Sequence, residues 1–300
     1  MAGGSTGQQD PSGGQQVRRG TAARSTTAPQ RRCRRGRRPA CLGGRTFSAP
    51  LVVAATGAFS RPHRPDLPGL AGFPGQVLHS ARYRSPQGLE GRRIVVVGGG
   101  NSAVQIAIEL AVVARVILAT RHPLRFVPQT IAGRDAHLWL RRTGLDGAGW
   151  ARPLLTGGKG APVFDTGAYR AQIATGNPDR RPLFTRIDGD QVVWADGSRE
   201  QVEAVLLATG YRPGVDYLAD LGALDDQRRP LHRGGLSLTH RGLGYVGLEW
   251  QRSFASATLR GVGADARHVL KRLLKRHHRP PAQPPVRAGR PGGQGGRRVR

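Results

Sequence analysis

The sequence has little cysteine and no long hydrophobic run. Its two cysteines, Cys33 and Cys41, are not spaced as C-x-x-C, which argues against both a dithiol redox centre and a zinc site. Glu109 and Arg115 interrupt the most hydrophobic region, so no apolar run reaches the roughly 18 residues of a membrane span. The first residues also lack the apolar segment of a secretory signal. We therefore expect a cytoplasmic protein with no membrane span and no metal site.

Acidic residues are scarce as well, and the formal net charge is +28. Residues 1–45 hold ten arginines and one acid, and residues 271–300 hold ten basic residues and no acid. Only three of the 47 basic residues are lysines, which is typical of arginine-rich composition bias rather than of selection for phosphate contacts. A basic tail that binds an anionic partner is the alternative. Because aromatic residues are not interleaved in the tails, we expect no specific nucleic-acid partner.

The two ends of the chain contain too few aliphatic residues to form a core. We predict a disordered basic leader over residues 1–42 and a disordered basic tail over residues 276–300. Between them, one pattern occurs twice with an offset of 153 residues: an apolar run that ends in Ala-Thr-Gly, at residues 51–57 and again at 205–210. Unbroken apolar runs indicate strands buried on both faces of a parallel sheet.

A glycine-rich nucleotide motif lies between these two repeats. It consists of Gly98, Gly99, Gly100, Asn101, Ser102 and Ala103, and it fits G-x-G-x-x-A. The pattern predicts a strand over residues 93–97 before it and a helix over about 101–114 after it, which is the context that a dinucleotide site requires. Gly98 allows the tight turn and Gly100 lets a phosphate approach the backbone. Ala103 allows the helix to pack closely on the strand.

The next predicted strand, over residues 115–120, ends where an NAD site would often place Asp or Glu to bind the ribose 2′-hydroxyl. Thr120 and Arg121 stand there instead, and they suit a 2′-phosphate, with Arg125 a weaker candidate. An ordinary exposed arginine is the alternative reading of Arg121. Further along, the sequence predicts a helix near residues 135–142, a hairpin turned at Asp196-Gly197 and a closing helix over about 260–275.

A third motif lies in the Pro- and Gly-rich linker of residues 58–90. Phe73, Gly75 and His79, followed by Tyr83, resemble the F-x-G-x-x-x-H-x-x-x-W fingerprint of class B flavoprotein monooxygenases, which include flavin-containing and Baeyer–Villiger monooxygenases. The resemblance covers roughly residues 43–275 and is closest to a small bacterial branch of NAD(P)/FAD-dependent oxidoreductases. Tyr83 replaces the usual Trp, which weakens a Baeyer–Villiger assignment.

The resemblance implies an α/β fold with a Rossmann-like NAD(P)-binding domain inserted in a partial FAD-binding domain of the two-dinucleotide-binding type. The domains would be a partial FAD-binding domain with linker (43–90 and 206–275) and an NADP-binding domain (91–205). FAD and NADP(H) would be the cofactors. The two repeats would be the crossings between domains, and their flavin-binding residues would be Thr56, Gly57, Ala208, Thr209, Gly210 and Tyr211.

The resemblance implies an oxidoreductase of the monooxygenase kind, which passes hydride from NADPH to the flavin and then activates O2 at flavin C4a. Its partners would be O2 and a small-molecule substrate. The flavin carries the chemistry, so no acid–base residue is assigned, and His79 and Arg82 would set linker geometry. The sequence departs from the family pattern at two places, which leave a catalytically silent NADP(H)-binding module or sensor as the alternative function. Residues 1–42 contain no G-x-G-x-x-G unit, and Leu248 follows Gly247 where relatives often have Asp.

Overall fold

The computed structural model describes residues 38–42, 45–148, 150, 152–156 and 162–278. They belong to two units, residues 1–49 and 50–300. In the first unit, β1 (Arg38–Leu42) and β2 (Arg45–Ala49) form an antiparallel hairpin. Residues 38–42 were predicted to belong to the disordered leader, and they differ because their backbone pairs with that of β2. The rest of the predicted leader, and the predicted tail beyond residue 278, lie outside the described residues.

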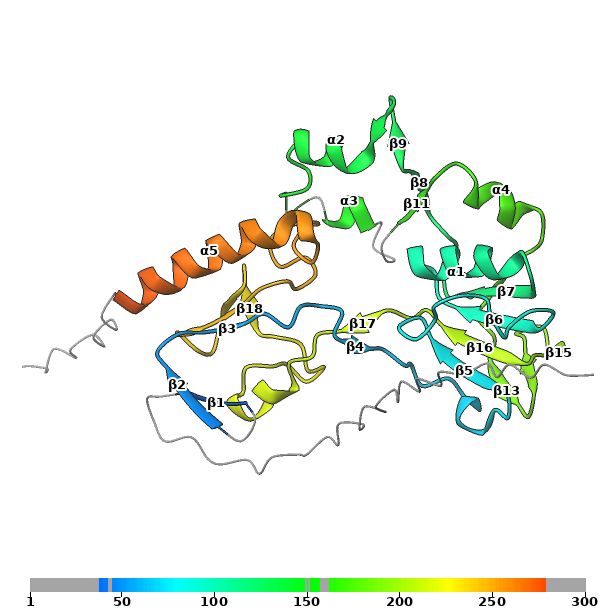
Figure 1. The fold of residues 1–300 in the computed structure, drawn as a ribbon, viewed down its shortest axis with the longest axis horizontal. Coiled ribbons are helices and arrows are strands. Elements are labelled where there is room, and N and C mark those ends of the chain that lie inside the picture. The colour runs from blue at the N-terminus through cyan, green and yellow to red at the C-terminus, as the bar shows by residue number, and fades with distance from the viewer. Residues whose placement is uncertain (1–37, 43–44, 149, 151, 157–161, 279–300) are drawn as a thin grey trace, which may run out of the picture. The chain divides into compact units, whose positions relative to one another are not determined.

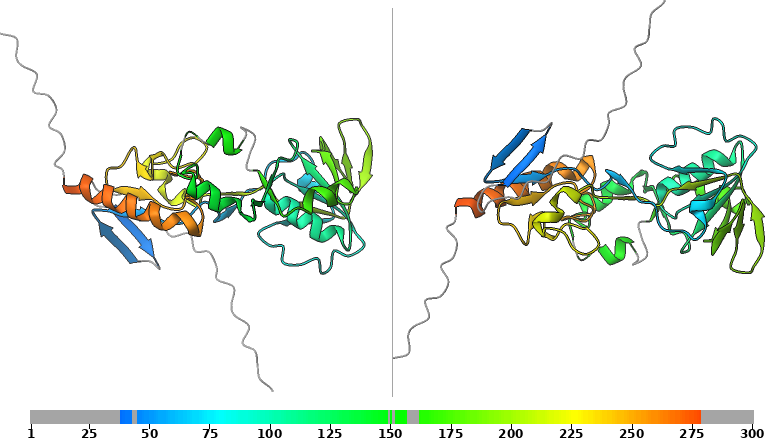
Figure 2. Two further views of the ribbon diagram at one scale, coloured as in Figure 1. Left: turned by 90° about the horizontal axis from the view of Figure 1, so that it is seen from above. Right: turned by 90° about the horizontal axis from the view of Figure 1, so that it is seen from below.

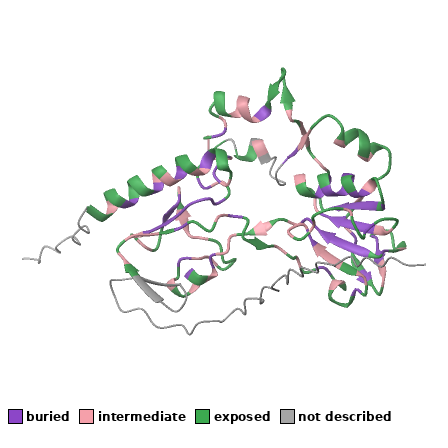
Figure 3. Ribbon diagram, viewed as in Figure 1, coloured by how far each residue is buried: buried purple, intermediate pink, exposed green. Residues whose placement is uncertain are grey.

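The second unit is built around a five-stranded parallel sheet with the order β12-β7-β6-β16-β5 (Figure 1). Its strands are β5 (Gln76–His79), β6 (Arg93–Val97), β7 (Arg115–Thr120), β12 (Asp179–Pro182) and β16 (Ala204–Leu207). Four residues of β6 and all of β16 are buried, as Figure 3 shows. An unbroken apolar run is stable here because both faces of the sheet are covered. The α/β fold with a parallel sheet is thereby confirmed.

Two different layers cover this sheet (Figure 2). Helix α1 (Asn101–Ala111) packs through Val104 and Leu110 on the face that carries Val96 and Leu118. The other face is covered by the antiparallel strands β13 (Arg186–Asp188), β14 (Gln191–Val193) and β15 (Arg199–Gln201). The predicted hairpin is confirmed, because β14 and β15 pair across the turn at Gly197. Each fully buried aliphatic side chain contributes roughly 1.5–3 kcal/mol to this core.

A second sheet in the same unit has the order β18-β19-β20-β3. It consists of β3 (Val52–Ala54), β18 (His232–Arg233), β19 (Leu236–Ser237) and β20 (Leu243–Tyr245). The apolar run of the first repeat forms β3, which pairs in parallel with β20. The apolar run of the second repeat lies in β16 of the five-stranded sheet. Helix α5 (Leu259–His278) packs beside this second sheet through Val269 and Leu273.

The chain passes between the two sheets along a short antiparallel ribbon of β4 (Arg61–Pro62) and β17 (Tyr211–Arg212). The remaining elements are η1 (Leu70–Gly72), β8 (Phe126–Pro128), β9 (Thr130–Ile131), β10 (Arg134–Asp135), α2 (Ala136–Arg142), α3 (Arg152–Thr156), β11 (Val163–Asp165), α4 (Tyr169–Ala174) and η3 (Asp216–Leu221). Among the helices described, none is both long enough and apolar enough to cross a bilayer.

Candidate functional site

The glycine turn between β6 and α1 is held by close backbone packing. Gly98 has a φ of +148°, and a Cβ atom there would lie 2.4 Å from the carbonyl oxygen of Ala208 and 3.1 Å from the Cβ of Ala103. Ala208 belongs to the second Ala-Thr-Gly repeat, so this repeat lies against the nucleotide motif. By contrast, nothing lies within 4 Å of a Cβ built on Gly100. Gly98 therefore has no room for a side chain, whereas the space around Gly100 is open.

The first turn of α1 offers N–H donors that no side chain of the described residues caps. Its N-cap, Gly100, has extended backbone and no side chain that accepts a hydrogen bond, and the first turn contains no acidic residue. Free N–H groups and the positive end of the helix dipole suit a phosphate. The side chain of Asn101 faces elsewhere: its Oδ1 accepts from the N–H of Phe164 at 2.8 Å and its Nδ2 donates to the carbonyl of Pro162 at 3.3 Å. The residues present thus fit a pyrophosphate held by backbone groups.

Arg180 of β12, an arginine that sequence reasoning missed, contacts the end of β7. Thr120 is 1% exposed, and its Oγ1 accepts hydrogen bonds from Arg180 Nε at 3.2 Å and Nη2 at 3.1 Å. Arg121 is exposed beside it, whereas Arg125 donates to the carbonyl of Leu155 at 3.2 Å. Arg180 lies 60 residues further along the chain, so no local pattern could have connected it with Thr120.

The fingerprint residues pack the linker against the five-stranded sheet. Phe73 is buried, and a Cβ on Gly75 would lie 2.6 Å from its ring and 2.5 Å from the carbonyl oxygen of Glu203, so glycine is required there. Tyr83 packs partly buried against the core cluster beneath α1. His79 ends β5, accepts at Nδ1 from the N–H of Ala81 at 3.1 Å and is only 1% exposed. These contacts support a structural role in the linker.

The two crossings are tied to each other near His79. Thr209 Oγ1 donates to the carbonyl of His63 at 2.5 Å, and the N–H of His63 donates to the carbonyl of Gly210 at 2.9 Å. The ring of Tyr211 meets that of His79 edge-on, with centroids 5.4 Å apart. Thr209, Gly210 and Tyr211 therefore lie at the ribbon of β4 and β17, whereas Gly57 follows β3 of the second sheet.

Gly57 and Gly247 bring two stretches of backbone close together beside the second sheet. Both have positive φ, and a Cβ on Gly247 would lie 3.2 Å from the Cα of Gly57. Thr56 is exposed beside them. Leu248, at the position where relatives often carry an acid, is buried in an apolar cluster. The glycine backbones thus fit a close approach by a flavin, but the acid that would hold the ribityl chain is absent.

A cavity of about 1020 Å³ adjoins the crossings. Its charged lining residues are Arg61, Arg64, Arg152, Arg212, Arg228, Arg229, Asp66, Asp216, Asp225 and Glu249. Asp216 pairs with both Arg61 and Arg228, and Asp225 pairs with Arg229. Arg64 and Arg212 have no ion-pair partner among the described residues. With six arginines against four acids, the lining has a formal net charge of +2 and suits an anionic ligand of dinucleotide or substrate size.

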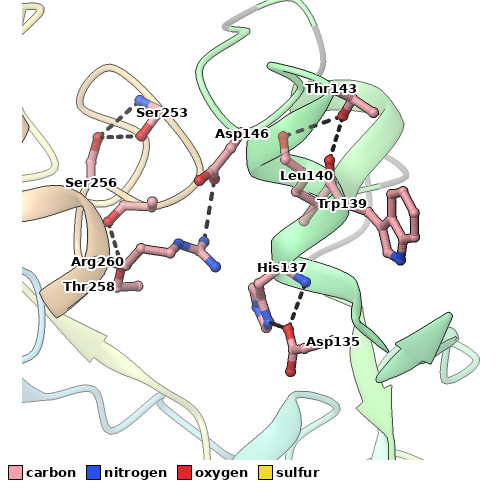
Figure 4. Close-up of polar contacts among 11 residues, drawn as sticks. Asp135, His137, Trp139, Leu140, Thr143, Asp146, Ser253, Ser256, Thr258 and Arg260 are labelled. Carbon is pink, nitrogen blue, oxygen red and sulfur yellow. Dashed lines mark hydrogen bonds and ion pairs between the residues drawn. The ribbon is translucent and has the colours of Figure 1, made fainter. Parts of the chain in front are cut away.

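The segment around α2 contacts the loop before α5, as Figure 4 shows. Arg260 Nη2 lies 3.4 Å from Asp146 Oδ1, and the carbonyl of Asp146 accepts from the N–H of Phe254 at 2.9 Å. The ring of His137 stacks near those of Phe164 and Phe254, with centroids 4.5 and 6.3 Å away. These contacts hold the segment between β7 and β12 against the part of the chain that follows β20.

Four partly or fully buried histidines make stability depend on pH. Burial lowers the pKa of His63, His79, His232 and His268 below 6.5, and for His63 the nearby arginines add to the effect. Since the unfolded chain then binds more protons, the free energy of unfolding should fall as pH drops below about 6.5. Burial raises the pKa of Glu249, so this one group favours the folded state as the pH falls and partly offsets the effect of the histidines.

We therefore expect a lower Tm at pH 5.5 than at pH 7.5, measured by circular dichroism at constant ionic strength. A His79→Gln variant should show a smaller difference between the two pH values, because one of the four groups no longer titrates. A Tm that is constant or higher at pH 5.5 would contradict this expectation.

Comparison with known proteins places the fold in a family. Residues 45–130 match the family described as flavin-binding monooxygenase-like. An uncharacterized CzcO-like oxidoreductase of Geobacillus kaustophilus is 32% identical over 76% of this chain and 66% of its own length. The indole-3-pyruvate monooxygenase YUCCA4 of Oryza sativa is 28% identical over 76% of this chain and 57% of its own. The chain thus spans just under two thirds, or less, of the length of these relatives.

Solved structures agree with the sequence relatives. The flavin-containing monooxygenase of Stenotrophomonas maltophilia superposes with a TM-score of 0.64 at 27% identity, over 79% of this chain and 69% of that one. Such enzymes combine two dinucleotide-binding folds, which confirms the predicted fold class. Together with the resemblance first noted at Phe73, Gly75 and His79, these matches show that the chain is similar to flavin-binding monooxygenase-like proteins.

Proposed function

We propose that this chain is an NADP(H)- and FAD-dependent oxidoreductase of the monooxygenase type. FAD and NADP(H) are the cofactors that its family implies. The observation that carries the proposal is the turn of Gly98 to Ala103, which ends a buried parallel strand and opens onto the uncapped start of α1. In that position, backbone N–H groups would bind the pyrophosphate of NADP(H), and Arg121 would approach its 2′-phosphate.

The flavin, when bound, supplies the redox chemistry with O2. The protein's residues would bind and orient it: Gly57 and Gly247 by close backbone approach, and Thr209, Gly210 and Tyr211 at the ribbon. Arg64 and Arg212 give the adjoining cavity the positive charge that would attract anionic groups of a cofactor or of a small-molecule substrate. In this proposal, residues 91–205 form the NADP-binding domain, and residues 43–90 and 206–275 form the partial FAD-binding domain and linker.

A second candidate is a catalytically silent NADP(H)-binding module. Leu248 favours it, because a buried apolar side chain occupies the position where relatives often hold the flavin with an acid. The two candidates share the nicotinamide site and differ in flavin binding and turnover. A measurement that separates nucleotide binding from NADPH oxidation therefore distinguishes them.

We expect isothermal titration of the full chain to give an NADP+ affinity at least about tenfold higher than that for NAD+, as one added ion pair to the 2′-phosphate would provide. Equal affinities would contradict the NADP assignment. NADPH oxidation, followed at 340 nm with FAD added, should exceed the rate with free FAD alone. Tight NADP+ binding without such oxidation would favour the silent module.

A further inference from the structure

We propose that Arg180 is a specificity-determining residue that binds the 2′-phosphate of NADP(H) together with Arg121. This inference rests on the proposed function, because it assumes that the nucleotide binds at the Gly98 turn. It adds a residue on a different strand to the one that the sequence motif indicates. The inference is carried by the position of the Arg180 guanidinium, its fixed orientation and the absence of an acidic partner.

The strand register places Arg180 on the face of the sheet that carries α1. β12 pairs in parallel with β7, and Arg180 lies opposite Leu118. Leu118 packs with Val96 and Val104 beneath α1. Since side chains alternate along a strand, Thr120 lies on the same face as Leu118. Arg180 thus extends along this face to the carboxyl end of β7, where the adenosine ribose lies in a dinucleotide-binding fold.

The contact with Thr120 fixes the orientation of the guanidinium. Arg180 Nε and Nη2 both donate to Thr120 Oγ1, at 3.2 and 3.1 Å, and Thr120 is itself buried. A guanidinium has five N–H donors in a rigid plane, so three remain for a ligand. An arginine that is already oriented loses less conformational entropy when it binds a phosphate.

The charge of Arg180 is not compensated by a carboxylate among the described residues. Asp179 of the same strand and Glu200 of β15 pair with its neighbour instead, because they accept from Arg181 at 2.7 and 3.2 Å. Arg181 also stacks on the ring of Trp194, which packs on the opposite face of the sheet. Of two adjacent arginines, Arg181 is therefore paired with acids, whereas Arg180 contacts Thr120, the residue before Arg121.

Adenine stacking is the other use that such a guanidinium could have, and it would serve NAD and NADP equally. A phosphate contact would serve NADP alone. The two uses are distinguished by the ligands adenosine 2′-monophosphate and adenosine 5′-monophosphate, which share the base and differ in the position of the phosphate.

The test is titration of NADP+, NAD+ and the two monophosphates into the wild-type chain and into Arg180→Ala, with Arg181→Ala as the matched control. We expect Arg180→Ala to weaken NADP+ and 2′-monophosphate binding about ten- to a hundredfold, the range for a hydrogen bond to a charged group. NAD+ and 5′-monophosphate affinities should change less than about twofold. Arg181→Ala should leave the preference for NADP+ intact.

Arg180→Lys keeps the charge and serves as a control for a folding defect in Arg180→Ala. It should retain part of the preference for NADP+ over NAD+ and lose the bidentate contact. The inference is wrong if Arg180→Ala keeps the wild-type preference for NADP+, or if it weakens NAD+ and NADP+ equally. A wild-type chain that binds neither dinucleotide would overturn the proposed function itself, and the inference with it.

Discussion

Replacing Gly98 by alanine is expected to abolish dinucleotide binding and to lower the free energy of unfolding by roughly 2–4 kcal/mol. The added Cβ would lie 2.4 Å from the carbonyl oxygen of Ala208, a backbone atom that cannot move aside cheaply. The φ of +148° adds strain for any residue with a side chain. Because α1 begins three residues later, the turn cannot relax without moving the phosphate-binding end of the helix. Chemical denaturation and NADP+ titration would measure the two effects.

The neighbouring glycines provide matched controls for this prediction. A Cβ on Gly99 would make an ordinary contact of 3.7 Å with Leu124, so Gly99→Ala should bind and fold nearly as the wild type does. Gly100→Ala has open space around it and should fold normally, yet its methyl group would occupy the position where a phosphate approaches. Loss of binding in Gly100→Ala without loss of stability is the result that distinguishes a ligand site from a structural turn. Full binding in both Gly98→Ala and Gly100→Ala would rule out the site.

The strand, turn and helix from residue 93 onward could be predicted because each signal is local. An unbroken apolar strand, three glycines and a helix start follow one another within a few residues, and the observed β6 and α1 agree with the prediction. The hairpin at Gly197 was predictable for the same reason. The helix was expected to continue to about residue 114 but ends at Ala111, since boundaries depend on packing more than on propensity.

Features that depend on strand order could not be read from the sequence. β5 lies in the Pro- and Gly-rich stretch interpreted as a linker, yet it pairs with β16 at the edge of the five-stranded sheet. Its short run of Gln76 to His79 gives no clear strand pattern, and only the partner strand explains it. Arg180 is a candidate for the same reason: nothing within ten residues of it predicts that β12 lies beside β7. The positive cavity likewise combines residues from both crossings.

The two Ala-Thr-Gly repeats show how far a local resemblance extends. Gly57 and Gly210 both have positive φ, at +71° and +82°, so the turn after each strand has the same backbone character. Their surroundings differ, however, because β16 is buried on both faces whereas Val53 of β3 is 41% exposed. The sequence similarity therefore predicts the turns well and predicts the burial of only one strand.

A second large effect is expected at Arg252, which forms an ion pair with a buried carboxylate. Arg252 Nη1 lies 3.0 Å from Asp265 Oδ1, the side chain of Asp265 is 3% exposed, and its Oδ2 has no hydrogen-bond partner. Arg252→Ala should lower the free energy of unfolding by about 3–5 kcal/mol, because it leaves a buried charge unpaired. Urea denaturation at pH 7 would measure the change.

Asp265→Leu is the informative counterpart. Asp265 belongs to the stripe of α5 that also buries Val269 and Leu273, so leucine continues an apolar face. Arg252 retains 35% side-chain exposure and can turn to water, so this variant should cost much less than Arg252→Ala. The double variant should resemble Asp265→Leu, since no unpaired charge remains. NADP+ affinity should stay near the wild-type value in all three variants, because the Gly98 turn lies on the other sheet. If both single variants lower the free energy of unfolding equally, the ion pair itself determines the effect, and not the burial of an unpaired carboxylate.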